Sequence, residues 1–135
     1  YLDFTTTSAF AKANYNPKTI AAIPLTIEDN SKPKAVKENS KSFWQLLDYC
    51  KKNDLRPLIV LTPVTQKHYK ARNPIMVNTR DSILRRARRM YPGLKVYDGE
   101  TASLEYPLFN NHNHLNAKGA QQFTKQVDAF LNKLD

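Results

Sequence analysis

The segment Leu58-Ile59-Val60-Leu61-Thr62-Pro63-Val64 decides the fold class of this chain. Its first four residues are a continuous run of branched apolar side chains, which is typical of a strand buried on both faces of a parallel sheet. A second short strand is expected at residues 94–97, with helices before, between and after the two strands. This alternation predicts an α/β fold in which a parallel sheet is flanked by helices and the two strands are neighbours.

Three helices are expected around these strands. The first begins at Ser42, because Ser42 and Gln45 have the spacing of a capping box and an apolar stripe follows them. The second lies within residues 74–92, with apolar side chains on one face and arginines mostly on the other. The third covers residues 117–134, whose apolar side chains recur at helical spacing and are expected to be core.

Residues 1–41 lack this regularity. Residues 20–27 are expected to form a short strand or an extended loop, and the polar residues 28–40, which include Pro33, a surface loop. We therefore expect one domain over residues 1–135, with an irregular N-terminal segment (1–41) and a strand and helix core (42–135). A chain of 135 residues that is 41% hydrophobic and 24% charged can bury a substantial core.

Cys50 is the only cysteine of the chain. It lies in the apolar pattern of the helix expected after Ser42 and has no partner for an internal disulfide, so we expect a packed thiol. No run reaches the roughly 20 apolar residues that a membrane-spanning helix needs, and no leader pattern opens the chain. Any targeting or anchoring segment is expected to lie outside these residues.

The chain carries 21 Lys and Arg against 12 Asp and Glu, a net charge of +9. Such a balance favours encounters with polyanions such as nucleic acid, anionic lipid or phosphate-rich wall polymers. The densest cluster lies within residues 74–92 and comprises Arg80, Arg85, Arg86, Arg88 and Arg89. A solvated helix face and a polyanion-binding surface both fit this pattern. Specific nucleic-acid binding is not expected, because no recognised motif accompanies the charge.

A polar loop with two histidines runs directly into the last expected helix: Phe109-Asn110-Asn111-His112-Asn113-His114-Leu115-Asn116. Histidine exchanges protons near neutral pH, and His114 at the entry to the helix is therefore the candidate general base. Asn111 is the candidate partner of its other ring nitrogen. An amide can fix the tautomer of the ring but cannot stabilise the imidazolium by charge. The alternative is a helix-entry histidine without chemistry.

Ligands of open parallel sheets bind beyond the carboxyl ends of the strands. We therefore expect the residues that follow each strand to converge with the histidine loop, namely Thr62, Thr65, His68 and Asp98. Of these, Thr62, Thr65 and His68 are candidate substrate-binding residues, together with Arg85 and Arg89 of the basic helix. His112 is expected to face solvent, and a surface position without a ligand is the alternative for His68.

His112 and His114 have the His-x-His spacing that can hold a cation. Zinc needs three or four protein ligands, and the loop offers no Asp, Glu or Cys to complete such a set. No metal site is therefore predicted. Phosphate-cradling glycine motifs are absent from a chain that has only three glycines, so no nucleotide cofactor is predicted either.

One block near the C-terminus carries a family pattern: Phe109, His114-Leu115-Asn116, Gly119-Ala120 and Phe123-Thr124. It resembles the last block of the SGNH/GDSL hydrolase superfamily, in which an aspartate, two spacers and the catalytic histidine precede a C-terminal helix. Residues 58–64 are similar to the late core strand of that fold. Pro63-Val64-Thr65 with Tyr69 is similar to its cell-envelope members, the DltD-like proteins of teichoic-acid D-alanylation and the AlgJ/AlgX-like polysaccharide acetylation proteins.

The resemblance implies the C-terminal portion of a flavodoxin-like, three-layer α/β domain, spanning roughly residues 43–134. It also implies an ester hydrolase or acyl transferase of the cell envelope or extracellular face, acting on acylated carbohydrate or a teichoic-acid-type polymer. His114 matches the catalytic histidine, whereas Asn111 stands where the family has its aspartate. No Gly-Asp-Ser-like nucleophile block occurs in the chain, so the serine is expected outside it, in an N-terminal half or a partner chain. The alternative is a non-catalytic basic binding module for an anionic glycopolymer or a partner protein.

Overall fold

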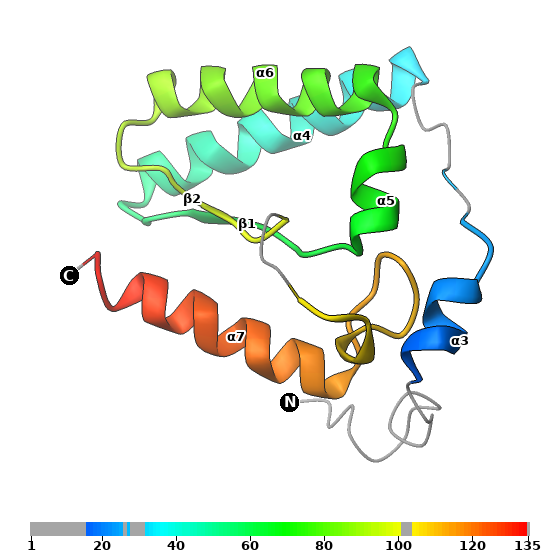
Figure 1. The fold of residues 1–135 in the computed structure, drawn as a ribbon. Coiled ribbons are helices and arrows are strands. Elements are labelled where there is room, and N and C mark those ends of the chain that lie inside the picture. The colour runs from blue at the N-terminus through cyan, green and yellow to red at the C-terminus, as the bar shows by residue number, and fades with distance from the viewer. Residues whose placement is uncertain (1–15, 26, 28–31, 101–103, 135) are drawn as a thin grey trace. The chain divides into compact units, whose positions relative to one another are not determined.

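The computed structural model describes residues 16–25, 27, 32–100 and 104–134 (Figure 1). The chain divides into two compact units. The helix-pair unit comprises residues 27–60 and 71–96, and the histidine-loop unit comprises residues 1–26, 61–70 and 97–135. The single domain expected over the whole chain stays a prediction.

The helix-pair unit contains the helices α4 (Pro33–Lys52) and α6 (Pro74–Met90) and the start of the strands β1 (Leu58–Leu61) and β2 (Lys95–Asp98). The two strands are neighbours in a parallel two-stranded sheet. Their register follows from two hydrogen bonds, in which Lys95 N donates to Pro57 O and Gly99 N donates to Leu61 O. Both partners advance by the same number of residues, as a parallel ladder requires. The predicted α/β class and the predicted pairing are thus confirmed.

The core of the helix-pair unit lies where both helices meet the start of the strands. Its buried residues are Leu47 of α4, Ala87 of α6, and Tyr91 and Leu94 of the turn that follows α6. Four partly buried side chains pack against them: Phe43, Trp44, Ile59 and Val96. Burial of each large apolar side chain contributes about 1.5–3 kcal/mol. Cys50 is buried and has no disulfide partner, as the packed-thiol prediction requires.

The start of α4 differs from the expectation. The helix begins at Pro33, so the surface loop expected over residues 28–40 is wrong from residue 33 onward. Proline is favoured in the first turn of a helix because its missing N–H has no intrahelical partner there. Ser42 lies inside the helix, and its hydroxyl donates to the carbonyl of Glu38 at 3.2 Å rather than capping a helix start. The capping box predicted at Ser42 and Gln45 is therefore wrong.

A short helix, α3 (Pro17–Ala22), lies in the region expected to be irregular. The Asn16 side chain accepts a hydrogen bond from Lys18 N at 2.9 Å and caps the first turn. Asparagine before proline is a helix-start signal, because asparagine supplies the cap and proline the preset first turn. The expectation of a strand or extended loop from residue 20 is therefore wrong as far as Ala22. Ile20 is buried.

The histidine-loop unit contains α5 (Gln66–Ala71), a short 3-10 helix (Tyr106–Leu108) and α7 (Ala117–Leu131). Tyr97 at the end of β2 packs on Phe123 and Phe130 of α7, with ring centroids 5.8 Å and 5.1 Å apart. Gly99 follows the strand, and a Cβ atom there would overlap the Phe123 ring and the Leu61 carbonyl oxygen. Only glycine therefore allows this close approach.

Candidate functional site

The histidine loop is closed by its own backbone. Phe109 and Leu115 form an antiparallel bridge, and Asn110 N donates to His114 O at 2.8 Å. Phe109 is fully buried, so the loop is fixed at its base by packing as well as by hydrogen bonds. Residues 110–114 consequently project from a closed base rather than from an open connection.

Asn116 joins this loop to α7. Its Oδ1 accepts from Gly119 N at 2.9 Å, which is the N-cap bond of the helix. Its Nδ2 donates to Pro107 O at 2.6 Å and to Phe109 O at 3.3 Å. The side chain is buried, and an asparagine is required because one end must accept and the other must donate.

Asn111 and His114 form the predicted pair. Asn111 Oδ1 accepts from the backbone N–H groups of Asn113 at 3.1 Å and of His114 at 2.9 Å. The same oxygen lies 3.0 Å from Nδ1 of the His114 ring. The two backbone donors identify this amide atom as the oxygen, since the NH₂ group cannot accept them. An oxygen only accepts, so Nδ1 of His114 carries the proton.

The tautomer of His114 leaves a basic nitrogen at Nε2. In a neutral imidazole with its proton on Nδ1, the lone pair is on Nε2, where a general base needs it. The His114 side chain is exposed, and Nε2 has no hydrogen-bond partner among the residues that the structure describes. The ring is thus oriented at one nitrogen and accessible at the other.

His112 has the opposite arrangement. Only 4% of its surface is exposed, so the expectation that it faces solvent is wrong. Its Nε2 lies 2.9 Å from the carbonyl oxygen of Ile23, and its Nδ1 lies 3.0 Å from the hydroxyl of Thr65. The carbonyl can only accept, so Nε2 carries a proton, and the Thr65 hydroxyl lies within hydrogen-bond distance of both Nδ1 and, at 3.2 Å, the His112 carbonyl oxygen. His112 therefore fastens the loop to two segments distant in sequence.

Thr65, a predicted substrate-binding residue, contacts the histidine loop through several hydrogen bonds. Besides its contact with the His112 ring, its backbone N–H donates to His112 O at 2.9 Å. Thr65 is 2% exposed. Its role in substrate binding stays a prediction, but the observed contacts are those of an anchor for the loop.

The other residues expected to converge with the histidine loop are Thr62, His68 and Asp98. Thr62 is exposed, His68 is half-buried on α5, and Asp98 accepts from Glu100 N at 3.0 Å. Neither Thr62 nor Asp98 is hydrogen-bonded to the histidine loop within the described part of the chain. Of Thr62, Thr65 and Asp98, the structure therefore brings Thr65 to the histidine loop.

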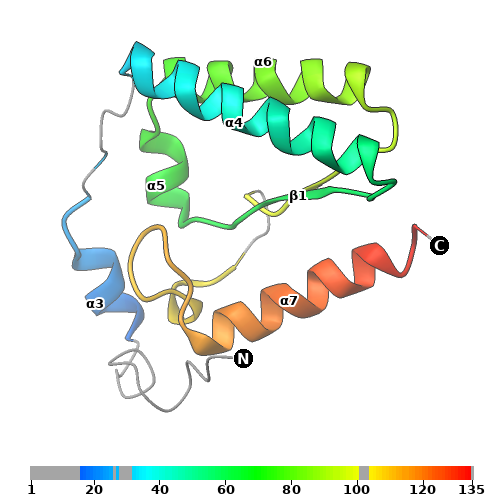
Figure 2. The same cartoon turned by 180° about the vertical axis from the view of Figure 1, so that it is seen from behind.

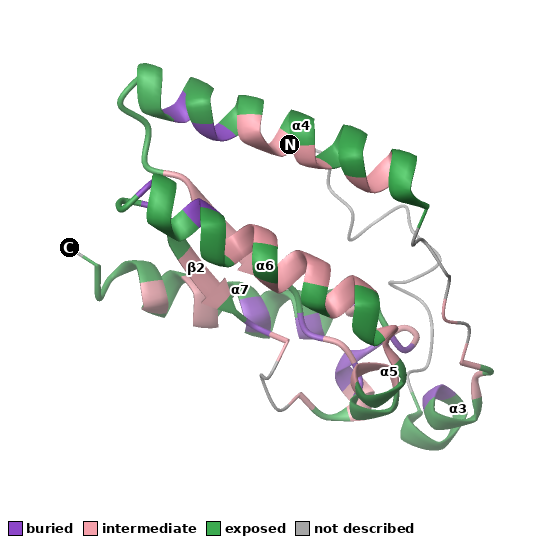
Figure 3. Ribbon diagram, turned by 90° about the horizontal axis from the view of Figure 1, so that it is seen from above, coloured by how far each residue is buried: buried purple, intermediate pink, exposed green. Residues whose placement is uncertain are grey.

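Arg85 and Arg89 lie in the helix-pair unit, where both are exposed on α6. Figure 3 shows that α6 alternates between exposed and partly buried segments along its length. In residues 16–25, 27, 32–100 and 104–134, no group of three or more His, Cys, Asp or Glu side chains is arranged to hold a metal ion. The same residues include no helix long and apolar enough to cross a membrane.

Sequence reasoning missed the anchoring roles of His112 and Asn116. The signal for Asn116 was local, because asparagine followed by Ala-Lys-Gly is an N-cap pattern. Nothing local signals the role of His112, since its partners are 47 and 89 residues away.

No protein-family model, curated protein or solved structure matches this chain. Two features of the structure indicate a function: the oriented and accessible ring of His114, and the positive charge of α4 and α6.

Proposed function

We propose that this chain is the C-terminal portion of an SGNH-like α/β domain that hydrolyses or transfers an acyl ester. The proposed substrate is an acylated carbohydrate or teichoic-acid-type polymer of the cell envelope or extracellular face. In this proposal His114 is the general base, and the serine nucleophile is supplied from outside these residues, by an N-terminal half or a partner chain.

The observation that supports the proposal is the 3.0 Å contact between Asn111 Oδ1 and His114 Nδ1. It fixes the one tautomer whose exposed nitrogen can take a proton from a nucleophile. A helix-entry histidine without chemistry has no need for its tautomer to be fixed. The second support is the closed base of the loop, which holds the ring in place before any substrate arrives.

Acylation of the serine has two proton transfers, and deacylation repeats them with water or an acceptor hydroxyl as the attacking group, which releases the acyl group and restores the serine. Nε2 of His114 takes the proton of the serine hydroxyl as the oxygen attacks the acyl carbon, and the imidazolium then gives that proton to the departing alkoxide. Asn111 keeps the ring oriented through Nδ1–H during both steps. Being uncharged, it gives the imidazolium less stabilisation than a carboxylate would, and so we expect a slow enzyme.

The proposal is tested by hydrolysis of an aryl acetate by the full-length protein, including the segment that supplies the serine. His114→Ala is expected to abolish activity above the spontaneous rate. The matched control is Asn113→Ala, because Asn113 is exposed and contributes only its backbone N–H to the site. The control should retain the parental rate.

Equal rates with and without His114 would overturn the proposal. Absence of activity in the full-length protein that carries a serine would overturn it as well. Either result would favour the non-catalytic binding module for an anionic glycopolymer or a partner protein.

A further inference from the structure

The helices α4 and α6 lie side by side and run in the same direction (Figure 1, Figure 2). The guanidinium carbon of Arg86 lies 5.0 Å from the ring centroid of Trp44. One turn further along, the Tyr91 hydroxyl donates to Asp48 Oδ1 at 2.6 Å. Both partners advance together along the two helices, so these two contacts fix the alignment of α4 with α6.

These two helices hold most of the excess charge of the chain. They contain ten Lys and Arg and three Asp and Glu, a net charge of +7 out of +9 for the whole sequence. Two of the three carboxylates are already engaged, Asp48 by the Tyr91 hydroxyl and Asp81 by Arg80 at 2.9 Å. The two helices therefore keep a large net positive charge after all three of their carboxylates are counted.

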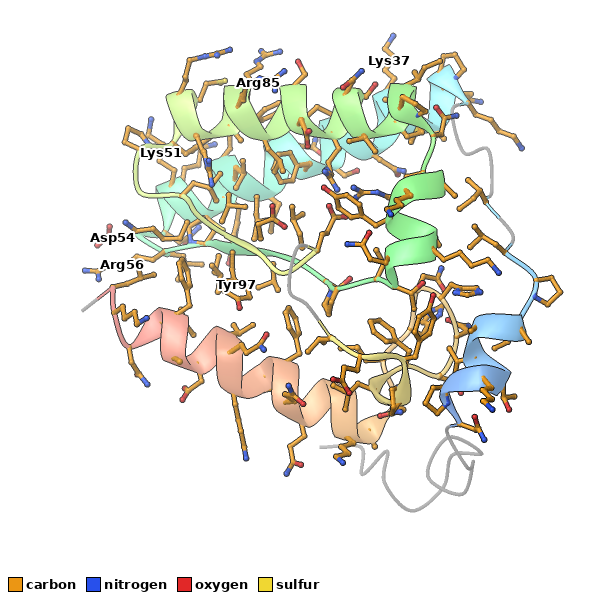
Figure 4. The ribbon with its side chains drawn as sticks, viewed as in Figure 1. Lys37, Lys51, Asp54, Arg56, Arg85 and Tyr97 are labelled. Carbon is orange, nitrogen blue, oxygen red and sulfur yellow. The ribbon has the colours of Figure 1, made fainter. Side chains whose placement is uncertain are left out.

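Six exposed cations, three at helical spacing on each helix, form what we call the basic helix face: Lys34, Lys37 and Lys41 on α4, and Arg85, Arg86 and Arg89 on α6. None of the six is in an ion pair with another described residue. In Figure 4 the labelled Lys37 and Arg85 both point away from the strands.

The spacing of the basic helix face suits a linear polyanion. Residues three or four apart on one helix follow each other at intervals of about 4.5–6 Å along its axis. Lys34, Lys37 and Lys41 therefore form a row of charges at intervals comparable to the repeat of an extended phosphodiester chain. Ser82 and Asn78, both exposed one and two turns before Arg86, add neutral donors beside the arginines.

We propose that the basic helix face binds the phosphodiester backbone of a linear polymer without reading nucleobases. This binding does not depend on the activity proposed for His114, which lies in the other unit. A negative binding experiment would therefore not contradict the activity proposed for His114, and a negative activity experiment would not contradict polymer binding.

Two other occupants fit the face less well. Recognition of bases in a single strand uses exposed aromatic rings, but Arg86 covers Trp44, and Tyr49 lies about 140° further round α4. Insertion into a membrane surface needs a row of large apolar side chains beside the basic ones. The exposed large apolar residues of the two helices form no such row: Leu46 and Tyr49 lie more than one turn beyond the lysine row on α4, and Ile75 and Met90 lie at opposite ends of α6.

The test measures binding of a twelve-unit abasic phosphodiester oligomer to the whole chain by fluorescence anisotropy. If about five phosphates are contacted, affinity should fall about 100-fold between about 50 and 200 mM salt, because counterion release sets the dependence. A thymidine oligomer of the same length should bind within about threefold of the abasic oligomer if bases contribute nothing.

The decisive variant is the double change Lys37→Glu and Lys41→Glu, with Arg85→Glu and Arg89→Glu as an independent second variant. The matched control is Lys118→Glu with Lys125→Glu, because these exposed lysines of α7 give the same change in net charge. Each face variant should weaken binding at least about tenfold and flatten the salt dependence, whereas the control should change affinity about twofold or less.

Three results would overturn the proposal. An equal loss in the control would mean that net charge alone attracts the oligomer. Thymidine binding about tenfold tighter than abasic binding would indicate a nucleic-acid interface. Preferential binding to vesicles that contain anionic lipid, with the abasic oligomer unable to compete, would indicate a membrane surface. Helix content measured by circular dichroism shows whether each variant has folded.

Discussion

Asn116→Ala should destabilise the histidine loop and the start of α7 together. The alanine removes the bond from Gly119 N to Oδ1 and the bond from Nδ2 to Pro107 O. Asn116 is only 2% exposed, so water has little access to the Gly119 N–H and the Pro107 carbonyl once their partner is removed. The change thus combines a lost helix cap with the loss of the donor to two carbonyls, that of half-buried Pro107 and that of fully buried Phe109.

The expected cost follows from these two losses. Replacing an N-cap asparagine by alanine costs about 1 kcal/mol. Leaving a buried acceptor without its donor costs about 1–3 kcal/mol. The free energy of unfolding should therefore fall by about 2–4 kcal/mol, and with a slope of about 2 kcal/mol per molar urea the midpoint should move down by about 1–2 M.

Urea unfolding followed by circular dichroism at the helix band measures this change. Asn113→Ala is the matched control, since it is the same substitution in the same loop at an exposed side chain. Asn116→Ser retains an acceptor for Gly119 N and should fall between the two. A midpoint for Asn116→Ala that matches the control would refute the reasoning, because it would mean that the buried hydrogen bonds contribute nothing.

Three further predictions follow from single contacts. Asn111→Asp should raise aryl-acetate turnover of the full-length protein, because a carboxylate stabilises the imidazolium; the reverse change costs about 10⁴-fold in the serine-protease triad, and an unchanged rate would count against a catalytic histidine. The hydrogen bond to Asp48 and partial burial raise the pKa of Tyr91 above 10.0, so its stabilising effect is complete below pH 10 and is lost as pH rises through the raised value. Tyr91→Phe should flatten the alkaline loss of stability measured by urea midpoints, whereas the exposed Tyr49→Phe should not. Gly99→Ala should lower the thermal midpoint by an amount equivalent to about 1–3 kcal/mol, and an unchanged midpoint would show that the neighbouring ring yields without cost.

The sequence by itself determined the elements whose signals are local. The run Leu58–Leu61 was identified as a strand because four consecutive branched apolar residues have no amphipathic helical pattern. The helix within residues 74–92 was identified from its apolar spacing, and Asn73 and Pro74 mark its start in the structure. The second strand was placed one residue early, at 94–97 instead of Lys95–Asp98, since Leu94 turns back to bond Tyr91 O.

The same holds for the pairing of Asn111 with His114. Two residues lie between them in the loop, so the Asn111 side chain can reach the His114 ring, and the spacing is therefore informative from the sequence alone. Two helix starts, at Pro17 and Pro33, differ from the prediction. The polar composition of these segments favoured a loop, whereas a proline in the first turn is a local signal for a helix start.

Only the tertiary structure decided the surroundings of His112. A loop of asparagines and histidines looks solvated in sequence, because each side chain is polar and nothing nearby is apolar enough to cover it. The ring is buried because Thr65 and the Ile23 carbonyl satisfy its two nitrogens, and these partners come together through folding rather than through proximity in the chain.

The tertiary structure also decided where the charge acts. Composition gives a net charge of +9, and the arginine cluster is visible in the sequence, but the lysines of α4 lie some forty residues earlier. The contact between Arg86 and Trp44 sets the register of the two parallel helices, so that the lysine row, which lies before Trp44 on α4, precedes the arginines along the pair. Sequence spacing within one helix cannot specify that alignment, and so the basic helix face exists only in the folded chain.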